Sequence, residues 1–442
     1  MAIQLSDHFT YKKLLRFVMP SIIMMIFTSI YGVVDGFFVS NYAGEEAFEA
    51  VNFIMPFLML PGALGFMFGT GGSALIAAKL GEGEQRTANR YFSLLIYVGT
   101  GLGILLAALC IVFLRPIALF LGADEAMLTY CVRYGRIILL ALPALILQFM
   151  FQSFFVTAEK PKLGLFVTLA AGFTNIILDF LLVGILSLDV EGAAIATAAS
   201  QLVGGIIPLF YFFSKNNSLL RLGKTKWEGK ALLHTCVNGS SELMTNLSLS
   251  LVNMLYNFQL IRFLGNDGIA AYGTIMYVNF IFISVFIGFS VGTAPIVSFH
   301  YGAGNRPELK NVLKKSTVFN IIASALMLAL ALLLSDPLSA LFVGYNEALF
   351  ELTARAFRLY SLSFLVLGFN IYASSFFTAL GNGVLSALIS FLRTLVFQIA
   401  GILLLPLIWE ADGIWFSVTV AEAAALIITV ILLAKNRKRY GY

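Results

Sequence analysis

The stretch Gly65-Phe66-Met67-Phe68-Gly69-Thr70 returns later in the chain as Gly288-Phe289-Ser290-Val291-Gly292-Thr293. Further pairs recur in the same order, at offsets between 221 and 223 residues. They are Gly81-Glu82-Gly83 with Gly302-Ala303-Gly304, Arg133-x-x-Arg136 with Arg355-x-x-Arg358, Ser153-Phe154-Phe155 with Ser375-Phe376-Phe377, and Glu191-Gly192 with Asp412-Gly413. Ordered matches at nearly one offset indicate that the chain is an internal duplication.

The repeated unit is strongly apolar. Of the 442 residues, 60% are apolar and only 12% are charged, and the mean hydropathy is +0.91. Soluble domains carry about 25% charged residues, so a soluble enzyme, a disordered chain and a fibrous repeat are excluded. The apolar runs are too long for barrel strands, and the sequence therefore predicts an all-α integral membrane protein.

Twelve apolar runs are long enough to cross the hydrocarbon core. They are residues 13–40, 51–79, 88–114, 127–157, 163–186, 191–214, 231–263, 269–300, 309–334, 348–379, 384–408 and 413–434. Six spans per repeat give both halves the same topology, so we expect two six-helix bundles around a central cavity, related by an axis near the membrane normal. The predicted domains are an N-terminal bundle (1–214), a cytoplasmic linker (215–230), a C-terminal bundle (231–434) and a cytoplasmic tail (435–442).

The basic residues predict the orientation. With both termini in the cytoplasm, 21 of the 28 Lys and Arg residues lie on the cytoplasmic side, and only Arg115 and Arg262 lie at the opposite ends of spans. This bias follows the positive-inside rule. We therefore expect a multi-pass protein of the bacterial cytoplasmic membrane with both termini inside. The basic residues then face anionic lipid, and nucleic acid is not an expected partner.

Four acids lie clearly within the predicted spans: Asp35, Asp179, Glu242 and Glu422. A carboxylate at membrane depth costs several kcal/mol unless it is paired, protonated or hydrated, so each is a candidate functional residue. A structural scaffold could also arise by duplication, but a scaffold has no evident reason to keep carboxylates inside lipid. The acids therefore favour a transporter.

Three spans of the first half carry polar side chains to one depth. Asp35 and Asp179 each precede the outer end of their span by about seven residues, which is roughly 10 Å along a helix. Thr197 follows the outer start of the sixth span by about the same distance. Tyr31 precedes Asp35 by four residues and Asn175 precedes Asp179 by four, so each pair shares a helix face. These five side chains are predicted to form one cluster.

Two carboxylates in a low-dielectric interior do not both stay ionised without a cation. The cluster is therefore expected to bind H⁺ or Na⁺, and oxygen donors alone favour a hard cation over a transition metal. In the sodium case the ligands would come from Asp35, Asn175, Asp179 and Thr197. The alternative is that the two acids only cap or pair with neighbouring helices.

The seventh predicted span carries a polar stripe. Glu242, Asn246, Ser250, Asn253 and Asn257 are spaced by three or four residues, which places them on one helix face. In lipid such a face must meet a cavity or another helix, and we favour a cavity. Glu422 stands alone in its span, and both an interhelical hydrogen bond and a functional role are open for it.

Several other functions lack their motifs. Gly223-Lys224-Thr225 has Ser218 where a phosphate loop begins with glycine, so no ATP motor is predicted. The three histidines and three cysteines are scattered. They form no recognisable metal site or disulfide framework. No nucleophile stands beside a base in a span, and we do not expect an enzyme.

The sequence resembles the multidrug and toxic compound extrusion (MATE) family, and more closely its MepA-like bacterial subgroup. The resemblance spans essentially the whole chain and the six-plus-six repeat. It is carried by residues 35–40 (DGFFVS), 69–73 (GTGGS) leading to 79–81 (KLG), 175–179 (NIILD) and 191–194 (EGAA).

This resemblance implies an antiporter, with no cofactor, that exports amphipathic, often cationic drugs in exchange for H⁺ or Na⁺. Residues matching the family's first-half cation site are Asp35, Asn175, Asp179 and Thr197, and Tyr31 matches its tyrosine one turn before the first acid. Another branch of the family uses acids in the seventh and tenth helices. Glu242 matches the seventh, but the tenth span offers Asn370 and no interior acid, so a second-half sodium site is not expected and we favour H⁺.

The substrate cavity is harder to predict. The whole chain contains 41 Phe and 13 Met residues, a composition that suits a pliable apolar cavity. Our candidates for the cavity are Glu242, Asn246, Asn253, Asn257, Gln148, Gln152, Met55 and Met276. The chain is expected to act as a monomer. A flippase for lipid-linked oligosaccharides on a similar fold is the main alternative. It calls for a lateral basic groove and interior arginines, of which the sequence offers only Arg393. A channel is a further alternative.

Overall fold

The structure is a computed structural model that describes residues 3–42 and 45–442, apart from the side chains of residues 37, 39–42, 45–48 and 126. Within these ranges every regular element is a helix, which confirms the all-α prediction. The elements before the linker are α1 (Tyr11–Tyr42), α2 (Glu45–Gly81), α3 (Gln85–Leu121), α4 (Glu125–Leu140), α5 (Leu142–Thr157), α6 (Pro161–Leu178), the π-helical segment η1 (Asp179–Ile185) and α7 (Asp189–Phe213).

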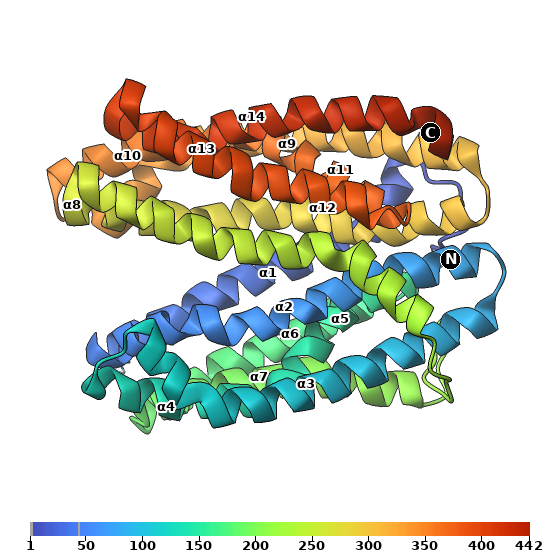
Figure 1. Ribbon diagram of the computed structural model, residues 1–442, viewed down its shortest axis with the longest axis horizontal. Coiled ribbons are helices and arrows are strands. Elements are labelled where there is room, and N and C mark those ends of the chain that lie inside the picture. Colours follow the sequence, from blue (N-terminus) through green and yellow to red (C-terminus); the bar gives the residue numbers. More distant parts are fainter. Residues whose placement is uncertain (1–2, 43–44) are drawn as a thin grey trace.

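The elements after the linker repeat this pattern. They are α8 (Gly229–Gly302), α9 (Arg306–Val343), α10 (Glu347–Ser361), α11 (Phe364–Ala379), α12 (Gly383–Phe391), the π-helical segment η2 (Leu392–Val396), α13 (Phe397–Leu404) and α14 (Pro406–Tyr440). Figure 1 shows these helices running roughly parallel along the long axis of the molecule, with both termini near one end. We call this end the termini end.

The helices provide the predicted number of crossings. Nine described helices are long and apolar enough to span a membrane, or eleven when the bent pairs α4 with α5 (54°) and α10 with α11 (46°) each count as one span. The number includes α8 once, although α8 has 74 residues and leaves helical geometry at Gly265 (φ 64°, ψ −149°). A straight helix of that length would measure about 110 Å. Counting the two arms of α8 separately gives twelve crossings in the described part of the chain.

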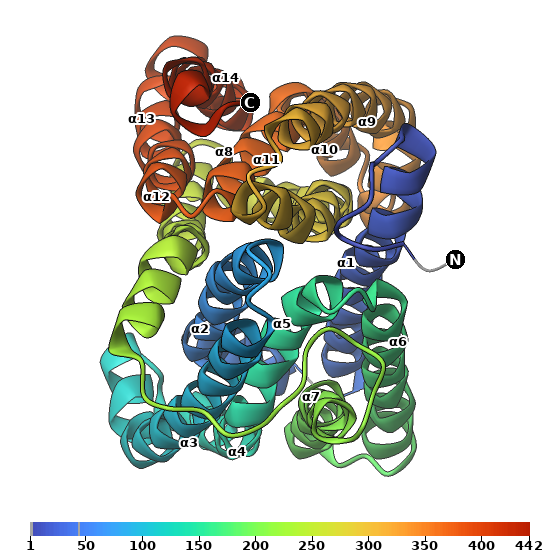
Figure 2. The ribbon, with the colours of Figure 1, turned by 90° about the vertical axis from the view of Figure 1, so that its right-hand side faces the viewer.

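The two repeats lie side by side. In Figure 2, α2 to α7 occupy one part of the molecule and α9 to α14 the other, while the first residues of α8 pass between them. Each half has its own apolar core, one around Phe92, Phe154 and Phe212 and one around Phe286 and Trp415. Each core forms where helix faces pack against one another and are not covered by lipid.

Helix α1 belongs to both halves. A third apolar core joins Phe9, Phe17 and Val18 of the N-terminal region to Phe289 and Ile296 of α8. The other end of α1 packs beside α6 and α7, as shown by the hydrogen bonds of Asp35 described below. A movement of α1 near Asp35 can therefore be transmitted along this single helix to the second half.

The halves meet in close backbone contact near the termini end. A Cβ atom at Gly81 would lie 2.0 Å from the Phe299 carbonyl oxygen, and one at Gly302 would lie 2.1 Å from the Ala78 carbonyl oxygen. Gly81 and Gly302 are equivalent positions in the sequence repeat. Because any larger side chain would collide with backbone there, glycine permits the two halves to close at this end.

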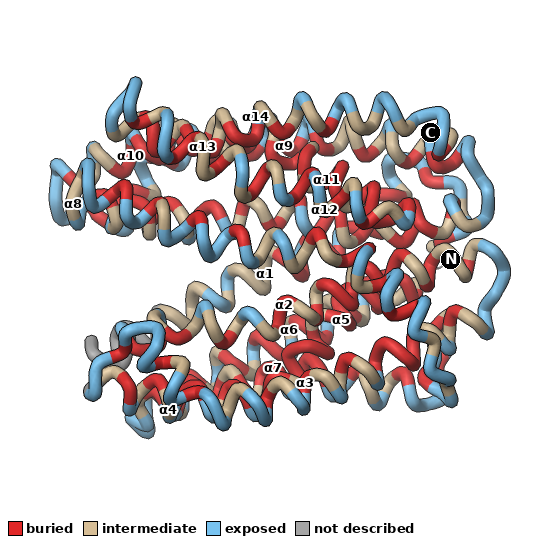
Figure 3. Tube along the Cα trace, viewed as in Figure 1, coloured by how far each residue is buried: buried red, intermediate tan, exposed pale blue. Residues whose placement is uncertain are grey.

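The outer faces are apolar. Val112, Phe210 and Leu333 expose 71%, 72% and 74% of their surface. Figure 3 shows exposed residues along the outer faces and helix ends, and buried residues inside the halves and where they meet. Apolar side chains on the outside of a helical protein of this size match a lipid environment.

Some helices extend beyond the predicted spans. α3 ends at Leu121 instead of residue 114, and α9 ends at Val343 instead of residue 334. α14 continues to Tyr440, through most of the segment predicted as a tail. The prediction followed the apolar run, but a helix does not have to end where the hydrocarbon ends. The two π-helical segments were also not predicted.

Candidate functional site

The first-half cluster joins three helices. The Thr197 hydroxyl of α7 donates to Asp35 Oδ1 of α1 at 3.1 Å. The Asn175 side-chain amide of α6 lies 3.4 Å from the same Asp35 oxygen and 3.4 Å from Thr197 Oγ1. The structure thus brings together three residues that the sequence placed at one depth.

Asp179 lies beside this group, at the point where α6 widens into η1. Its side chain is fully buried, and it lies close enough to Asp35 for the two carboxyl groups to interact. Among the described residues, neither Asp179 oxygen has a hydrogen-bond partner, and Asn175 Oδ1 has none. A π turn often marks a functional position in a helix, and here it begins at the buried acid.

Three unpaired oxygens and a second carboxylate share this small space. A buried carboxylate without a partner is costly, and a proton or a small cation removes that cost. The atoms available to bind an ion are oxygens of two carboxylates, an amide and a hydroxyl, which suit H⁺ or a hard monovalent ion. The arrangement can therefore bind a small cation, and its use for coupling stays a prediction.

Tyr31 lies at the edge of the cluster. Its hydroxyl lies close to the Gln148 side chain and within electrostatic range of Asp35. Gln148 is buried on α5, and its Oε1 has no partner among the described residues. Gln152, one turn further along α5, is also buried, with both amide atoms unpaired. These unpaired polar atoms belong to the buried interior of the first half.

The sequence reasoning missed Tyr134. This fully buried α4 residue lies close to Thr197 and within electrostatic range of Asp35 and Asp179. Its hydroxyl also lies 3.9 Å from the sulfur of Met55. A signal was available in the repeat, because the equivalent position of the second half is Ala356. Because the first half has Tyr134 where the second half has Ala356, this position points to a site that only the first half contains.

The second half holds a different buried cluster. Arg393 Nη1 lies 3.2 Å from Glu422 Oε1, and the Asn370 amide donates to Glu422 Oε2 at 2.8 Å. Arg393 belongs to η2, so both π-helical segments carry a buried ionisable residue. The sequence left an interhelical hydrogen bond and a functional role open for Glu422, and the structure shows the interhelical hydrogen bond from Asn370. The ion pair with Arg393 was not predicted, because Arg393 is distant in the sequence but adjacent in the fold.

Glu242 lies within electrostatic range of the same arginine, and two asparagines of the polar stripe have local partners. The Asn246 amide donates to the Glu242 carbonyl at 2.8 Å, and Asn253 accepts from the Tyr272 hydroxyl at 2.7 Å. Asn257 is exposed. A cavity along the stripe therefore stays a prediction.

Met276 is half-buried, and the Asn279 amide lies 3.9 Å from its sulfur. Met55 is also half-buried, beside Tyr134. The structure places these two methionines in different halves, so any cavity that includes both must lie between the halves.

Comparison with known proteins agrees with this architecture. A family model described as MatE matches residues 20–181 and 243–404, one match in each repeat. The multidrug export protein MepA of Staphylococcus haemolyticus (strain JCSC1435) is 25% identical over 431 residues, covering 97% of this chain and 94% of the relative. MepA of Staphylococcus aureus (strain MRSA252) is 23% identical over 432 residues, with the same coverage.

Solved structures show the same fold. An outward-facing conformation of a multidrug resistance MATE family transporter of the MOP superfamily superimposes with a TM-score of 0.93 at 20% identity, covering 100% of this chain and 98% of the other. A crystal structure of MATE in complex with MaL6 gives a TM-score of 0.93 at 20% identity, with 98% of each chain covered.

Proposed function

The chain belongs to the MATE family of multidrug export transporters, and from this premise we propose that it is a secondary active antiporter that exports amphipathic organic cations in exchange for H⁺ or Na⁺. It is a multi-pass membrane transporter and not an enzyme. The proposed substrates are drugs of the kind that the name of MepA implies. We favour H⁺ as the coupling ion.

One observation carries the proposal. Asp35 and Asp179 interact in the interior of the first half, and both oxygens of Asp179 lack a hydrogen-bond partner among the described residues. A bound H⁺ or Na⁺ cancels one of the pair's two negative charges, and its loss leaves both carboxylates charged in a low-dielectric interior. The affinity of the pair for a cation therefore depends on how the surrounding helices pack.

Coupling follows from mutual exclusion. The ion occupies the acid pair when the drug is absent, and the loaded pair favours a packing of α1, α6 and α7 that releases the drug. Asp35 lies on the same helix as Phe17 and Val18, which pack in the core joined to the second half. Rearrangement around Asp35 thus has a direct mechanical connection to the other bundle.

The proposed moving parts are the two predicted bundles, residues 1–214 and 231–434, joined by the linker 215–230. With the termini in the cytoplasm of a bacterium, the close contacts of Gly81 and Gly302 lie on the cytoplasmic side. The halves diverge towards the opposite end in Figure 1. We therefore assign this conformation to the state that faces outward.

The flippase alternative receives less support. A diphosphate held inside the molecule needs free interior cations, and Arg393 is already ion-paired with Glu422. Glu242 also lies within electrostatic range of Arg393. An arginine whose charge is already offset by carboxylates attracts a diphosphate less strongly than a free arginine does.

Transport in proteoliposomes tests the proposal. A fluorescent organic cation should move against its gradient when ΔpH or ΔNa⁺ is imposed, and movement that ignores both gradients overturns the antiport. Asp179→Asn should abolish gradient-driven transport without loss of folded protein. Asp267→Asn is the matched control, because Asp267 is an exposed carboxylate two residues after the break of α8 at Gly265. This variant should transport normally.

A further inference from the structure

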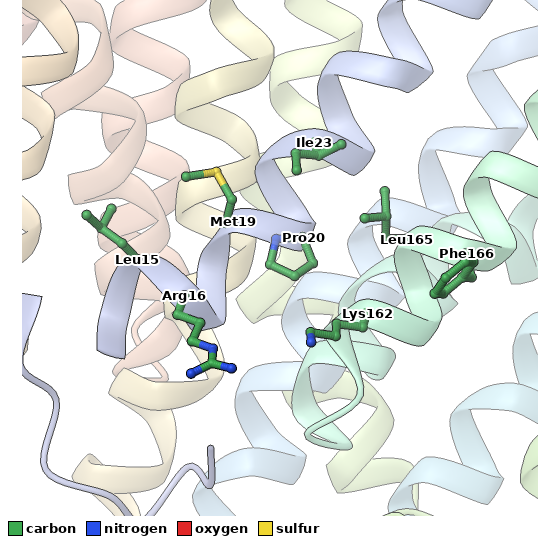
Figure 4. Close-up of a pocket in the computed structure, with 8 residues that line it drawn as sticks. All are labelled: Leu15, Arg16, Met19, Pro20, Ile23, Lys162, Leu165 and Phe166. Carbon is green, nitrogen blue, oxygen red and sulfur yellow. The ribbon is translucent and has the colours of Figure 1, made fainter. Parts of the chain in front are cut away.

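A groove on the outer face of the first half lies between α1 and α6. It has a volume of about 420 Å³ and is lined by Leu15, Arg16, Met19, Pro20, Ile23, Lys162, Leu165 and Phe166. The groove is separate from the acid pair, because Arg16 precedes Asp35 by nineteen residues, about 28 Å along α1. Figure 4 shows that its walls come from the first turns of both helices.

The groove is divided into a charged end and an apolar end. In Figure 4, Arg16 and Lys162 extend their head groups towards one another at the end nearer the helix starts, and Ile23 and Leu165 lie at the other end. Met19, Ile23 and Phe166 expose 43%, 43% and 69% of their surface. In a membrane these side chains face acyl chains.

The two cations lack acidic partners. Within the described chain neither Arg16 nor Lys162 forms an ion pair, whereas the neighbouring Lys13 pairs with Asp7 at 2.8 Å. The first turn of α6 has no acidic residue, and Lys160 at its N-cap makes no side-chain capping bond. The positive end of the α6 dipole therefore adds to the charge of Arg16 and Lys162.

We propose that this groove binds one anionic phospholipid, with the phosphate between Arg16 and Lys162 and an acyl chain along Met19, Ile23 and Phe166. The two cations supply charge-assisted hydrogen bonds to the phosphate. From Arg16 to Ile23 the helix rises about 10 Å, so the apolar wall begins at the depth where the chain of such a lipid begins. With the orientation proposed above, the lipid belongs to the cytoplasmic leaflet, whose anionic lipids attract basic residues.

Other occupants fit less well. An organic cation would meet two positive charges, so the groove is not a second drug site. Free phosphate matches the charged end but leaves the exposed apolar wall without a function. A lipid uses both ends.

Native mass spectrometry of the full chain, purified in a neutral detergent, tests the site. Phosphatidylglycerol should bind with a defined stoichiometry, and phosphatidylcholine at the same concentration should bind much more weakly. The double variant Arg16→Gln/Lys162→Gln should bind phosphatidylglycerol about thirtyfold less tightly, since each cation near the lipid surface contributes about a factor of five.

A matched double variant separates a built site from diffuse surface charge. Lys310 and Lys314 on α9 are also exposed and also lack ion-pair partners among the described residues. Lys310→Gln/Lys314→Gln should leave phosphatidylglycerol binding unchanged. An equal loss in both double variants overturns the proposal.

Leu165→Trp tests the apolar end, because the indole fills the groove and leaves both charges in place. It should weaken phosphatidylglycerol binding while a soluble glycerol phosphate is unaffected. If inorganic phosphate competes as well as the lipid, or if Leu165→Trp has no effect, the site is an anion site and not a lipid site. Unfolding temperatures of the variants show that they are folded.

Binding is measured without an ion gradient, so its outcome does not depend on the proposed antiport. A scrambling assay with a fluorescent phosphatidylglycerol tests whether the protein moves the bound lipid across the membrane. The bound lipid should stay in its leaflet, and transfer across the vesicle would identify it as cargo and overturn its assignment as a resident ligand.

Discussion

The Thr197 hydroxyl donates a 3.1 Å hydrogen bond to Oδ1 of Asp35, and this bond joins α7 to α1 in the interior of the first half. The two residues are separated by 162 positions in the chain. The Asn175 amide reaches the same carboxylate oxygen. The Asp35 carboxylate is thus held on one side by donors, while the neighbouring Asp179 accepts no hydrogen bond from any described residue.

Thr197→Ala is expected to impair coupling. The variant removes a hydrogen bond to a charged group, which contributes about 1.5–3 kcal/mol, so ion-driven drug export should fall about tenfold or more. Thr197→Ser keeps the hydroxyl and should retain most of the activity. The measurement is the initial rate of drug uptake in proteoliposomes with an imposed gradient. Equal rates in the two variants would show that the hydroxyl has no part in coupling.

Gly239→Ala is expected to prevent the halves from closing. A Cβ at Gly239 would lie 2.0 Å from the Met67 carbonyl oxygen, across the boundary between the halves. Because backbone atoms cannot move aside as a flexible side chain can, the halves must separate at the termini end. Spin labels on the two halves should report a longer distance there.

Gly101→Ala serves as its control, since a Cβ at Gly101 has nothing within 4 Å. It should leave the distance unchanged and raise the unfolding temperature slightly, because alanine favours a helix by about 1 kcal/mol over glycine. A Gly239→Ala protein with the wild-type distance would contradict the packing described above.

Breaking the Arg393–Glu422 pair is expected to destabilise the second half. Glu422→Gln leaves the buried guanidinium without its carboxylate, which costs about 3–5 kcal/mol. The double variant Arg393→Met/Glu422→Leu removes both charges and should recover most of this loss. Unfolding in a mild detergent measures the difference. If the double variant is no more stable than Glu422→Gln, Arg393 and Glu422 do not act as a pair.

The N-terminal segment is expected to loosen as the pH rises. The Leu5 amide donates to Glu159 Oε1 at 2.6 Å, and burial raises the pKa of the Glu159 carboxyl. A raised pKa means that the folded protein holds the proton more tightly than the unfolded chain does. Its stabilising effect is present below the unfolded pKa of about 4.3 and is lost as the pH rises through the folded value.

Glu159→Gln removes this titration. The wild-type free energy of unfolding should fall, relative to the variant, as the pH increases above about 4.3. Amide exchange at Leu5 and Phe9 reports the same change locally, because both side chains are fully buried in the folded state. A constant difference between wild type and variant across this range would contradict the prediction.

The sequence predicted those features that depend on distance along a helix. Asp35, Asn175, Asp179 and Thr197 lie together because residue counts from span ends determine depth, and the structure places them in one cluster. Helix bounds were less accurate, since the apolar run does not determine where α9 stops.

Features that depend on the rotation and packing of helices could not be predicted. Tyr134 faces the acid pair through the orientation of α4, and Arg393 reaches Glu422 because η2 and α14 lie side by side. The π turns at Asp179 and Arg393 have no recognised sequence signature here. The lateral groove also depends on the spacing of α1 and α6, which no pattern in either helix specifies.

Ion release on drug binding tests the coupling most directly. Purified protein in a weakly buffered detergent solution is titrated with a fluorescent organic cation, while a pH indicator and a sodium electrode follow the medium. We predict that each drug molecule bound displaces a proton or a sodium ion, and that Asp179→Asn binds the drug without releasing either. Equal release by wild type and Asp179→Asn, or none by wild type, would contradict the exchange of ion and cargo at the Asp35–Asp179 pair.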